Sequence, residues 1–234
     1  MMAGKDVMLI TGTRKGIGRY LAEYYLKKNF FVFGCSRGET DLTDRNYRHY
    51  CLDISDEQAV KRLFKDLNND FGKLDVLINN AGMATMNHSL LTPLSSVRII
   101  LETNVVGCFL FSREAAKIMK KNNYGRIINF STIAVPLKLA GEAIYASSKA
   151  AVNNLTSVMA KEFSGMGITI NAVGPTPVKT DLIRNIPDVK IQELINKQTI
   201  KRFGSMNDIT NVIDFFIKPE SSFITGQIIY LGGL

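Results

Sequence analysis

The chain contains no tryptophan and only three cysteines and two histidines in 234 residues. Cys35, Cys51 and Cys108 are widely spaced and form no Cys-x-x-Cys pair, which argues against a disulfide framework and a zinc site. Free thiols are typical of a reducing compartment. Uninterrupted apolar stretches stay far below the roughly 20 residues of a membrane helix, and Lys5 and Asp6 interrupt any signal-peptide core. We therefore expect a cytoplasmic protein with no membrane segment.

The charge is unbalanced, with 29 Lys and Arg against 21 Asp and Glu and a formal net charge of +8. A basic excess is compatible with nucleic acid, an anionic surface or a phosphorylated small molecule as a partner. The basic residues are spread along the chain without a run of four, so we expect no nucleic-acid partner. The length fits a single domain over residues 1–234.

Short apolar runs alternate with segments of helical periodicity along the chain. This alternation is typical of a parallel sheet with helices on both faces. It predicts an α/β, doubly wound (Rossmann) fold with about seven strands, at 7–10, 30–35, 47–52, 74–78, 126–131, 168–173 and 227–231. Helices are expected at 17–28, after a capping box at 55–58, and at 95–122, 144–164, 189–198 and 207–217.

A glycine-rich loop, Thr11–Gly18, separates the first predicted strand from the first predicted helix. Glycines there let the backbone approach a pyrophosphate, and the helix N-terminus offers free N–H groups to its charge. Glycine spacing alone also occurs in purely structural turns, so the strand–turn–helix context carries the signal. The loop residues expected to bind a dinucleotide are Gly12, Thr13, Arg14, Lys15 and Ile17.

The end of the second predicted strand indicates which dinucleotide is bound. NAD(H) usually requires a carboxylate there for the 2′-hydroxyl of the adenine ribose. This chain has Cys35-Ser36-Arg37, and its nearest carboxylates, Glu39 and Asp41, come later. Arg37 and Lys15 could clamp a 2′-phosphate, although two solvated surface cations are the alternative. We predict NADP(H) as the cofactor, bound in part by Ser36 and Arg37.

Tyr145 and Lys149 are four residues apart in a predicted helix and therefore share one face. A cation stabilises a phenolate, so we expect Lys149 to lower the pKa of Tyr145 and allow proton exchange with a carbonyl oxygen. Thr132 lies thirteen positions before Tyr145 (145 − 132 = 13), next to Ser131, and strand alternation lets only one of these hydroxyls face Tyr145. Asn104, in a predicted helix that disfavours it, is either a further polar candidate or an exposed residue.

Together these residues resemble the short-chain dehydrogenase/reductase family in its single-domain form, along the whole chain from Thr11–Gly18 to Ile224–Gln227. The resemblance implies that Tyr145 is the general acid/base, that Lys149 lowers its pKa and holds the nicotinamide ribose, and that Asn104 anchors a water. It also implies further contacts with the cofactor. Asp53 and Ile54 would contact the adenine, and Asn80, Ala81 and Gly82 the ribose. Val178 and Thr180 would contact the carboxamide of the nicotinamide.

Two positions depart from the family pattern. The usual catalytic serine corresponds to Thr132, to which we assign the catalytic hydroxyl, with Ser131 as the alternative. Thr176 replaces a usual glycine, and a β-branched residue disfavours positive φ, so the loop over the nicotinamide is expected to differ in shape.

The pattern is most similar to 3-oxoacyl-acyl-carrier-protein reductases. Asn123 and Met166 replace arginines that dock the carrier, for which Lys120, Lys121 and Arg126 could partly compensate. An apolar lid, or packing on the domain, is expected from Leu182, Ile183, Ile186, Ile191, Leu194 and Ile195.

The resemblance therefore implies an NADPH-dependent reductase of a ketone such as a 3-oxoacyl thioester, bound to a carrier or free. The alternatives are a different ketone, from secondary metabolism or a sugar, and a regulatory protein that binds NADP(H) without catalysis. The family usually forms homotetramers or homodimers through its long helices, and we expect the same here.

Overall fold

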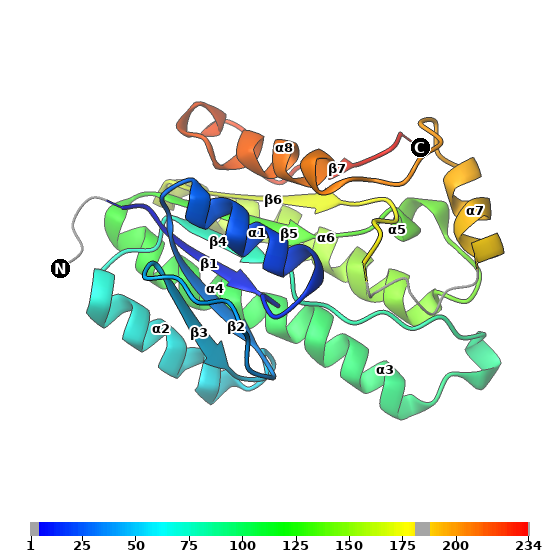
Figure 1. Cartoon of the computed structure of the whole chain (residues 1–234), viewed down its shortest axis with the longest axis horizontal. Helices are drawn as coiled ribbons and strands as arrows, with labels where there is room; N and C mark the ends of the chain where they lie inside the picture. The colour runs from blue at the N-terminus through cyan, green and yellow to red at the C-terminus, as the bar shows by residue number, and fades with distance from the viewer. Residues whose placement is uncertain (1–4, 181–187, 234) are drawn as a thin grey trace.

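The computed structural model of the protein describes residues 5–180 and 188–233. These residues form one sheet of seven parallel strands in the order β3-β2-β1-β4-β5-β6-β7 (Figure 1). The strands are β1 Val7–Thr11, β2 Phe31–Ser36, β3 Tyr47–Cys51, β4 Val76–Asn79, β5 Gly125–Phe130, β6 Ile168–Gly174 and β7 Ile228–Tyr230. The strand order reverses between β1 and β4, which confirms the predicted doubly wound fold.

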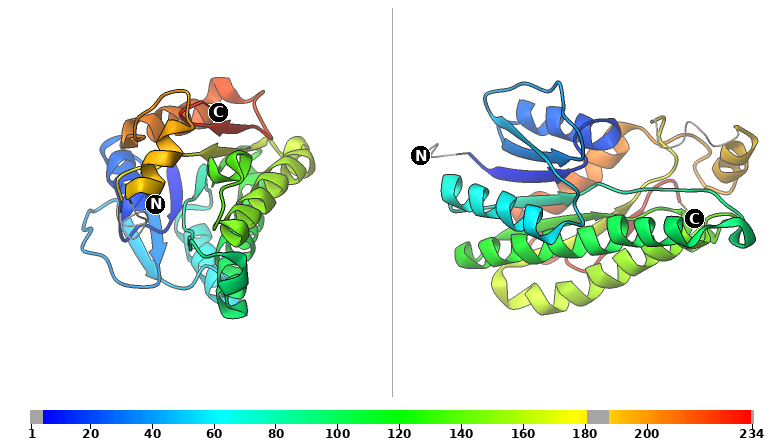
Figure 2. Two further views of the ribbon diagram at one scale, coloured as in Figure 1. Left: turned by 90° about the vertical axis from the view of Figure 1, so that its right-hand side faces the viewer. Right: turned by 90° about the horizontal axis from the view of Figure 1, so that it is seen from below.

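Helices cover both faces of this sheet. They are α1 Gly16–Lys27, α2 Glu57–Phe71, α3 Leu94–Leu101, α4 Cys108–Met119, α5 Ala134–Leu137, α6 Ala143–Phe163, α7 Asp188–Asn196 and α8 Met206–Ile217. Figure 2 shows α1 and α8 on one side of the sheet and α2, α4 and α6 on the other, in agreement with their contacts. The expected helices at 17–28, 144–164, 189–198 and 207–217 are present with ends that differ by at most two residues, whereas the helix expected at 95–122 is divided and α5 was not expected.

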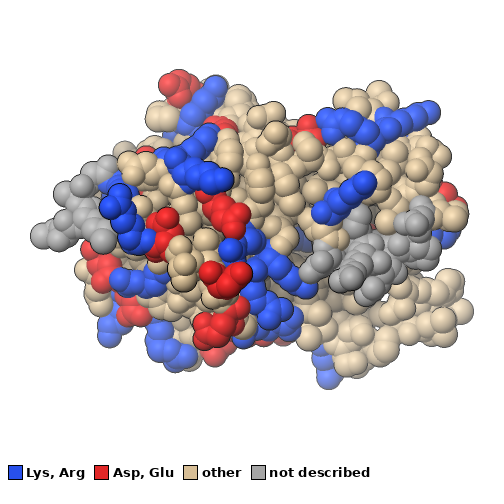
Figure 3. Space-filling view, in the orientation of Figure 1, with Lys and Arg blue, Asp and Glu red and all other residues tan. Residues whose placement is uncertain are grey.

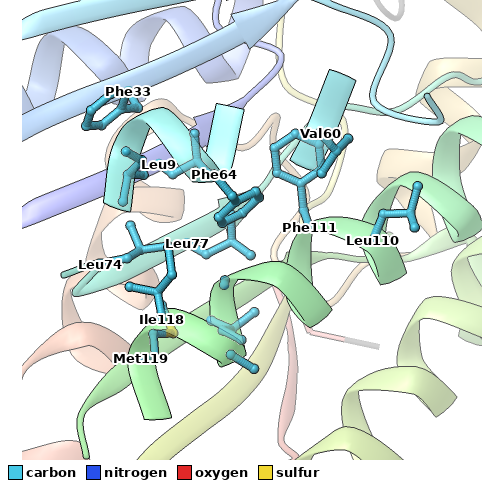
Figure 4. Packing of buried hydrophobic residues seen from close by; sticks show 14 of the residues in the cluster. Leu9, Phe33, Val60, Phe64, Leu74, Leu77, Leu110, Phe111, Ile118 and Met119 are labelled. Carbon is cyan, nitrogen blue, oxygen red and sulfur yellow. The ribbon is translucent and has the colours of Figure 1, made fainter. Parts of the chain in front are cut away.

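The hydrophobic core is divided by the sheet into two clusters. Val7 and Leu9 of β1 point into the cluster under α2, α4 and α6, and Met8 and Ile10 point into the cluster under α1 and α8. Successive side chains of a strand point to opposite faces, so a strand covered on both sides must be apolar throughout. Figure 4 shows the first cluster, in which Phe64 of α2 meets Phe111 of α4 with ring centroids 5.6 Å apart.

The long helix expected at 95–122 is helical from Leu94 to Asn122, but one turn within it is not α-helical. The turn, Glu102–Gly107, is π-helical and separates α3 from α4. A π-helical turn adds a residue to the helix and often occurs at functional sites. Periodicity in the sequence predicts the helix but does not reveal this turn.

By length and composition alone, Leu94–Asn122 could cross a membrane, contrary to the expectation that no stretch would qualify. The segment has a buried face: Phe111 and Ala115 of α4 are fully buried in the core cluster on the sheet, and Ile100 of α3, which packs along α6, is fully buried as well. A helix that packs in the core of a globular protein has the same apolar composition. Packing in the core therefore explains the apolar character of these three residues.

Charged side chains of both signs are mixed over the face shown in Figure 3. Many are paired, such as Arg19 with Asp41 and Arg202 with Asp208. On this face basic and acidic side chains are interspersed.

The start of α2 differs from the expected capping box. Asp56 is the N-cap residue, and its carboxylate accepts from the backbone N–H groups of Gln58 and Ala59. The Ser55 hydroxyl instead donates to Asp53 Oδ1 at 2.7 Å. The capping-box prediction was wrong because the competing acceptor on Asp53 draws Ser55 away from the helix.

Replacing Asp56 by Ala should lower the free energy of unfolding by about 1 kcal/mol, because two N–H groups of α2 lose their acceptor. Urea denaturation of the full chain measures the change. Ser55→Ala is the matched control and should have a clearly smaller effect. A larger loss from Ser55→Ala than from Asp56→Ala would show that Ser55 caps the helix after all.

Candidate active site

The predicted site residues meet at one edge of the sheet, where the carboxyl ends of β1, β4 and β5 lie side by side (Figure 1). β1 leads into the glycine-rich loop Thr11–Gly18, β4 into Asn80–Gly82, and β5 into Ser131 and Thr132. Ligands of doubly wound folds bind outside these strand ends at the point where the strand order reverses. The topology thus gathers residues that are more than one hundred positions apart.

The glycine-rich loop is held against the segment that follows β4. The Asn80 side-chain amide donates to the Thr11 carbonyl oxygen at 2.8 Å, and Ala81 N donates to Thr11 Oγ1 at 2.9 Å. Gly12 has a φ of +77°, and a side chain there would meet Asn80 and Ala81. At Gly18 a side chain would collide with the Gly12 carbonyl, so both glycines are required for the close packing of loop, helix and strand.

The start of α1 suits a pyrophosphate. Lys15 is the N-cap residue, its side chain does not cap the helix, and the first turn contains no acidic residue. The first N–H groups of the helix and its positive dipole end thus lie at the carboxyl edge of the sheet, which is the arrangement an anion requires. We call the region along this edge, from the start of α1 to Tyr145, the cleft. Arg14 and Lys15 are exposed here, and Thr180 lies about 4.0 Å from the position of a side chain on Gly16. The residues present therefore fit a dinucleotide.

A turn that we call the ribose turn, Ser36–Gly38, follows β2 at the adenine end of this cleft. Arg37 is exposed, and the Arg14 guanidinium lies against Gly38, 2.9 Å from the position that a side chain on Gly38 would take. Burial raises the pKa of Asp53, but hydrogen bonds from Ser55 and the charge of Arg37 outweigh it, and the net pKa is lowered. Ile54 is buried against Gly107 of the π-helical turn.

Tyr145 is near the start of α6 and pairs with Thr132. Burial raises the pKa of the Tyr145 phenol to about 12, and its hydrogen bond with Thr132 lowers this pKa only in part. Thr132 Oγ1 also accepts from Ala134 N at 3.2 Å, which orients the hydroxyl. Ser131, by contrast, is buried, and its hydroxyl has no hydrogen-bond partner among the described residues. Of the two candidates, Thr132 faces Tyr145.

Lys149 is buried one helical turn after Tyr145 and donates to the Phe130 carbonyl oxygen at 2.7 Å. Burial lowers its pKa from 10.5 to about 8. Here the ammonium is directed to Phe130 and the pKa of Tyr145 responds mainly to burial, so the lowering of that pKa by Lys149 stays a prediction. A phenol with this pKa is protonated at neutral pH and is therefore a proton donor.

Asn104 lies in the π-helical turn and is buried. Its side-chain amide donates to Met83 O and to Ser148 Oγ, both at 2.9 Å, and Asn104 Oδ1 accepts from Met83 N at 2.8 Å. Both amide protons are thus used within the protein, and one acceptor position of Oδ1 is left for a water. Gly82 lies directly beside Asn104 Oδ1 and Lys149 Nζ. Through these hydrogen bonds Asn104 links the segment after β4 to α6.

Sequence reasoning missed two residues next to Tyr145. Ser148 joins Asn104 to α6 by donating to the Tyr145 carbonyl oxygen at 2.7 Å. Glu142 is partly buried with a raised pKa, its Oε2 has no hydrogen-bond partner among the described residues, and its charge raises the pKa of Tyr145. Helical spacing, three residues before and after Tyr145, is the signal that could have found them.

The remaining expectations have mixed outcomes. Thr176 does not adopt positive φ; it is buried and its hydroxyl donates to Gln198 Oε1, so it causes no strain. Arg126 is 2% exposed and cannot dock a carrier, whereas Lys120 and Lys121 are exposed. Ile191 and Ile195 of α7 are buried in packing. Leu182, Ile183 and Ile186 lie outside the described residues.

Comparison with known proteins decides the family. The adh_short_C2 model, described as "Enoyl-(Acyl carrier protein) reductase", matches residues 12–233. The chain belongs to the short-chain dehydrogenase/reductase family. As a member it is an oxidoreductase.

Several relatives match along nearly their whole length. The 3-oxoacyl-[acyl-carrier-protein] reductase FabG of Vibrio cholerae is 29% identical over 97% of this chain and 96% of its own. Among solved structures, ElxO with NADP bound has a TM-score of 0.89 and 31% identity, covering 97% of each chain. A 4-hydroxyisoleucine dehydrogenase complexed with NADH has a TM-score of 0.88 and 27% identity, covering 98% of each chain.

The lowered pKa of Lys149 predicts how stability depends on pH. Between about pH 8 and pH 10.5 the unfolded chain keeps a proton on this residue that the folded chain has released. Burial of the charged amine therefore costs stability below pH 8, and this cost disappears as the pH rises to 10.5. Relative to Lys149→Met, which cannot titrate, wild type should gain on the order of 3 kcal/mol across this range.

Urea denaturation of both proteins at several pH values measures this difference. Other titrating groups cancel in the comparison, and the lost bond to Phe130 gives only a constant offset. A difference that stays constant from pH 8 to pH 10.5 would contradict the burial of a charged Lys149.

Proposed function

We propose that the protein is an NADPH-dependent carbonyl reductase in which Tyr145 donates a proton to the carbonyl oxygen. The observation that carries this proposal is the hydrogen bond between the half-buried Tyr145 phenol and the Thr132 hydroxyl, with Lys149 one helical turn away on α6. The surroundings raise the pKa of this phenol to about 12. A protonated phenol is what ketone reduction needs, because the oxygen becomes negatively charged as the carbon is reduced. The Thr132 hydroxyl is aligned to donate to the same oxygen.

The residues that would hold the cofactor are the glycine-rich loop, the ribose turn, Asn80–Gly82 and Thr180. When bound, the reduced nicotinamide supplies a hydride to the carbonyl carbon. Lys149, beside Gly82 and with a pKa of about 8, can hold or release a proton near neutral pH and so restore the proton of Tyr145. Asn104 fixes Gly82 and α6 relative to each other and offers its remaining acceptor position to a water.

The cofactor is NADP(H). The ribose turn contains Arg37 and no carboxylate, and the guanidinium of Arg14, from the glycine-rich loop, lies against its Gly38. Glu39, the first acidic residue after the turn, interacts with the Cys51 thiol. Asp41 is held by Arg19 at 2.5 Å. ElxO was solved with NADP and the 4-hydroxyisoleucine dehydrogenase with NADH, so the relatives use both dinucleotides and the local charges decide.

A 3-oxoacyl thioester is the first candidate substrate. The FabG relatives of Vibrio cholerae and Haemophilus influenzae are 3-oxoacyl-[acyl-carrier-protein] reductases, each 29% identical over nearly the whole chain. Docking of an acidic carrier would depend on Lys120 and Lys121, because Arg126 is buried and Asn123 is neutral. A free thioester would need no such contact.

A small polar ketone is the second candidate, and Glu142 favours it. A partly buried carboxyl with an unsatisfied oxygen beside Tyr145 suits a substrate that carries a hydroxyl or ammonium donor better than an acyl chain. Two structural relatives are named for hydroxylated substrates of this kind. They are the 4-hydroxyisoleucine dehydrogenase and the Thermoplasma acidophilum aldohexose dehydrogenase, the latter 26% identical with a TM-score of 0.89.

We further propose one domain that assembles as a homodimer or homotetramer in the cytoplasm. The exposed face of the Leu94–Asn122 segment is apolar, with Leu94, Ile99 and Phe109 at 61%, 43% and 39% exposure. A second copy would bury this face, since soluble monomers rarely expose contiguous apolar surface. All three cysteines are free, which fits a reducing compartment.

Loss of NADPH absorbance with a panel of ketones tests the function. The panel holds one 3-oxoacyl chain on acyl carrier protein and on coenzyme A, and small hydroxylated or amino ketones. Thr132→Val should lower kcat about 10²-fold, because one donor to the transition-state oxygen is lost. Thr132→Ser should keep most of the rate, and Tyr145→Phe should abolish it while NADPH still binds, as in the tyrosine-to-phenylalanine variant of ElxO solved with NADPH.

Ser131→Ala is the matched control, because this hydroxyl lies one position away and faces elsewhere. An active Thr132→Val beside an inactive Ser131→Ala would reverse the assignment of the hydroxyl. Tight NADPH binding without turnover of any ketone would contradict the reductase proposal. Equal kcat/KM for the carrier-bound and coenzyme A substrates would show that the carrier is not recognised.

A further inference from the structure

A chain of polar side chains runs beneath the adenine end of the cleft and is not explained by the proposed catalysis. Tyr47 and His49 of the edge strand β3 lie on one face of the sheet, two residues apart. Tyr47 Oη is 2.8 Å from Thr13 Oγ1 and 2.8 Å from His49 Nδ1. His49 Nε2 is 3.1 Å from both Ser36 Oγ and the Gly38 carbonyl oxygen.

These contacts reach across β2, and Gly34 makes them possible. Gly34 pairs with Ile10 of β1 and with His49 of β3, so it lies between the two ends of the chain of side chains. A side chain at Gly34 would collide with Tyr47 Oη and with Thr13 Oγ1. The gap in the middle strand is thus filled by the hydroxyls of Thr13 and Tyr47, which join the edge strand to the glycine-rich loop.

The Gly38 carbonyl oxygen and the neutral form of His49 together set the directions of these hydrogen bonds. The Gly38 carbonyl oxygen can only accept, so His49 Nε2 carries a proton and donates to it. In neutral His49, Nδ1 is then the acceptor, so Tyr47 Oη donates to it and Thr13 Oγ1 donates to Tyr47. Ser36 Oγ donates to the Gly38 carbonyl oxygen at 2.7 Å. His49 and Tyr47 together therefore fix the positions of both Thr13 and the ribose turn.

The ribose turn carries the charge that distinguishes the two nicotinamide dinucleotides. Arg37 is the middle residue of the turn, and the Arg14 guanidinium lies against Gly38. The positions of both guanidinium groups thus depend on the conformation that His49 imposes on Ser36 and Gly38. A 2′-phosphate would contact these groups, whereas the pyrophosphate site at α1 and the site around Tyr145 lie elsewhere along the cleft.

We propose that His49, supported by Tyr47, is a positioning residue that sets the preference of this protein for NADP(H) over NAD(H). His49 does not contact the reacting atoms; it holds the turn that places Arg37 and Arg14. An ordered turn meets the 2′-phosphate without first losing conformational freedom, and a loose turn does not. The inference rests on the proposed NADP(H) site and names the residues that determine its selectivity.

The test compares dissociation constants for NADPH and NADH, measured by calorimetry on the full-length protein without substrate. His49→Leu removes both hydrogen-bonding nitrogens and should weaken NADPH binding roughly tenfold while NADH binding changes less than twofold. Adenosine 2′,5′-bisphosphate, which has only the adenine end, should show the same loss as NADPH. His49→Gln keeps an amide donor for Gly38 and should recover most of the affinity.

Two further variants separate positioning from general damage to the fold. Tyr47→Phe should reproduce part of the NADPH-selective loss, because Thr13 and His49 lose their link. Tyr50→Phe is the matched control, since the Tyr50 hydroxyl contacts Asp66 and belongs to the neighbouring position of the same strand. Tyr50→Phe should leave both dissociation constants unchanged.

Equal weakening of NADPH and NADH by His49→Leu would overturn the inference, because a purely structural role affects both. Unchanged NADPH affinity in His49→Leu and Tyr47→Phe would overturn it as well. If wild type binds NADPH selectively in that case, the proposed function stands and only the role of His49 fails. If wild type binds neither dinucleotide, or prefers NADH, the proposed cofactor and the inference fail together.

Discussion

Burial at the carboxyl edge of the sheet acts in opposite directions on the two groups that matter most. It raises the pKa of the Tyr145 phenol to about 12 and lowers the pKa of the Lys149 amine to about 8. A low-polarity environment disfavours whichever form is charged, so the acid keeps its proton and the base tends to lose one. The site thus holds a neutral proton donor beside an amine that can exchange protons near neutral pH, which suits the reduction of a carbonyl group.

The sheet and its helices make this burial possible. Parallel strands bring the glycine-rich loop, Gly82 and Thr132 to one edge, and α6 carries Tyr145 and Lys149 over it. Asn104, presented by the π-helical turn, is bonded to Met83 and Ser148 and so fixes α6 against the segment after β4. At the other end of the cleft, β3 supports the ribose turn. Different side chains build the two ends, and the glycine-rich loop joins them through Thr11 and Thr13.

The sequence predicted the parts of the fold and site that depend on local pattern. Apolar runs and helical periodicity located the seven strands and the longer helices but not the short helix α5, and the glycine-rich loop between β1 and α1 predicted the dinucleotide site. Features set by tertiary contacts were not predictable. Asp53 draws Ser55 from the start of α2, Phe130 takes the Lys149 ammonium, and Arg126 is buried. His49 reaches the ribose turn only because Gly34 leaves a gap in the strand between them.

The ionisation of Tyr145 in the cofactor-free protein tests the central claim most directly. The chain has eight tyrosines, and 13C labelling of their ring carbons followed by NMR during a pH titration resolves each of them. The resonance that disappears in Tyr145→Phe belongs to this residue. The account predicts that it does not titrate below pH 10, in keeping with a pKa of about 12. A titration near neutral pH would contradict it, because Tyr145 would then be a phenolate rather than a proton donor.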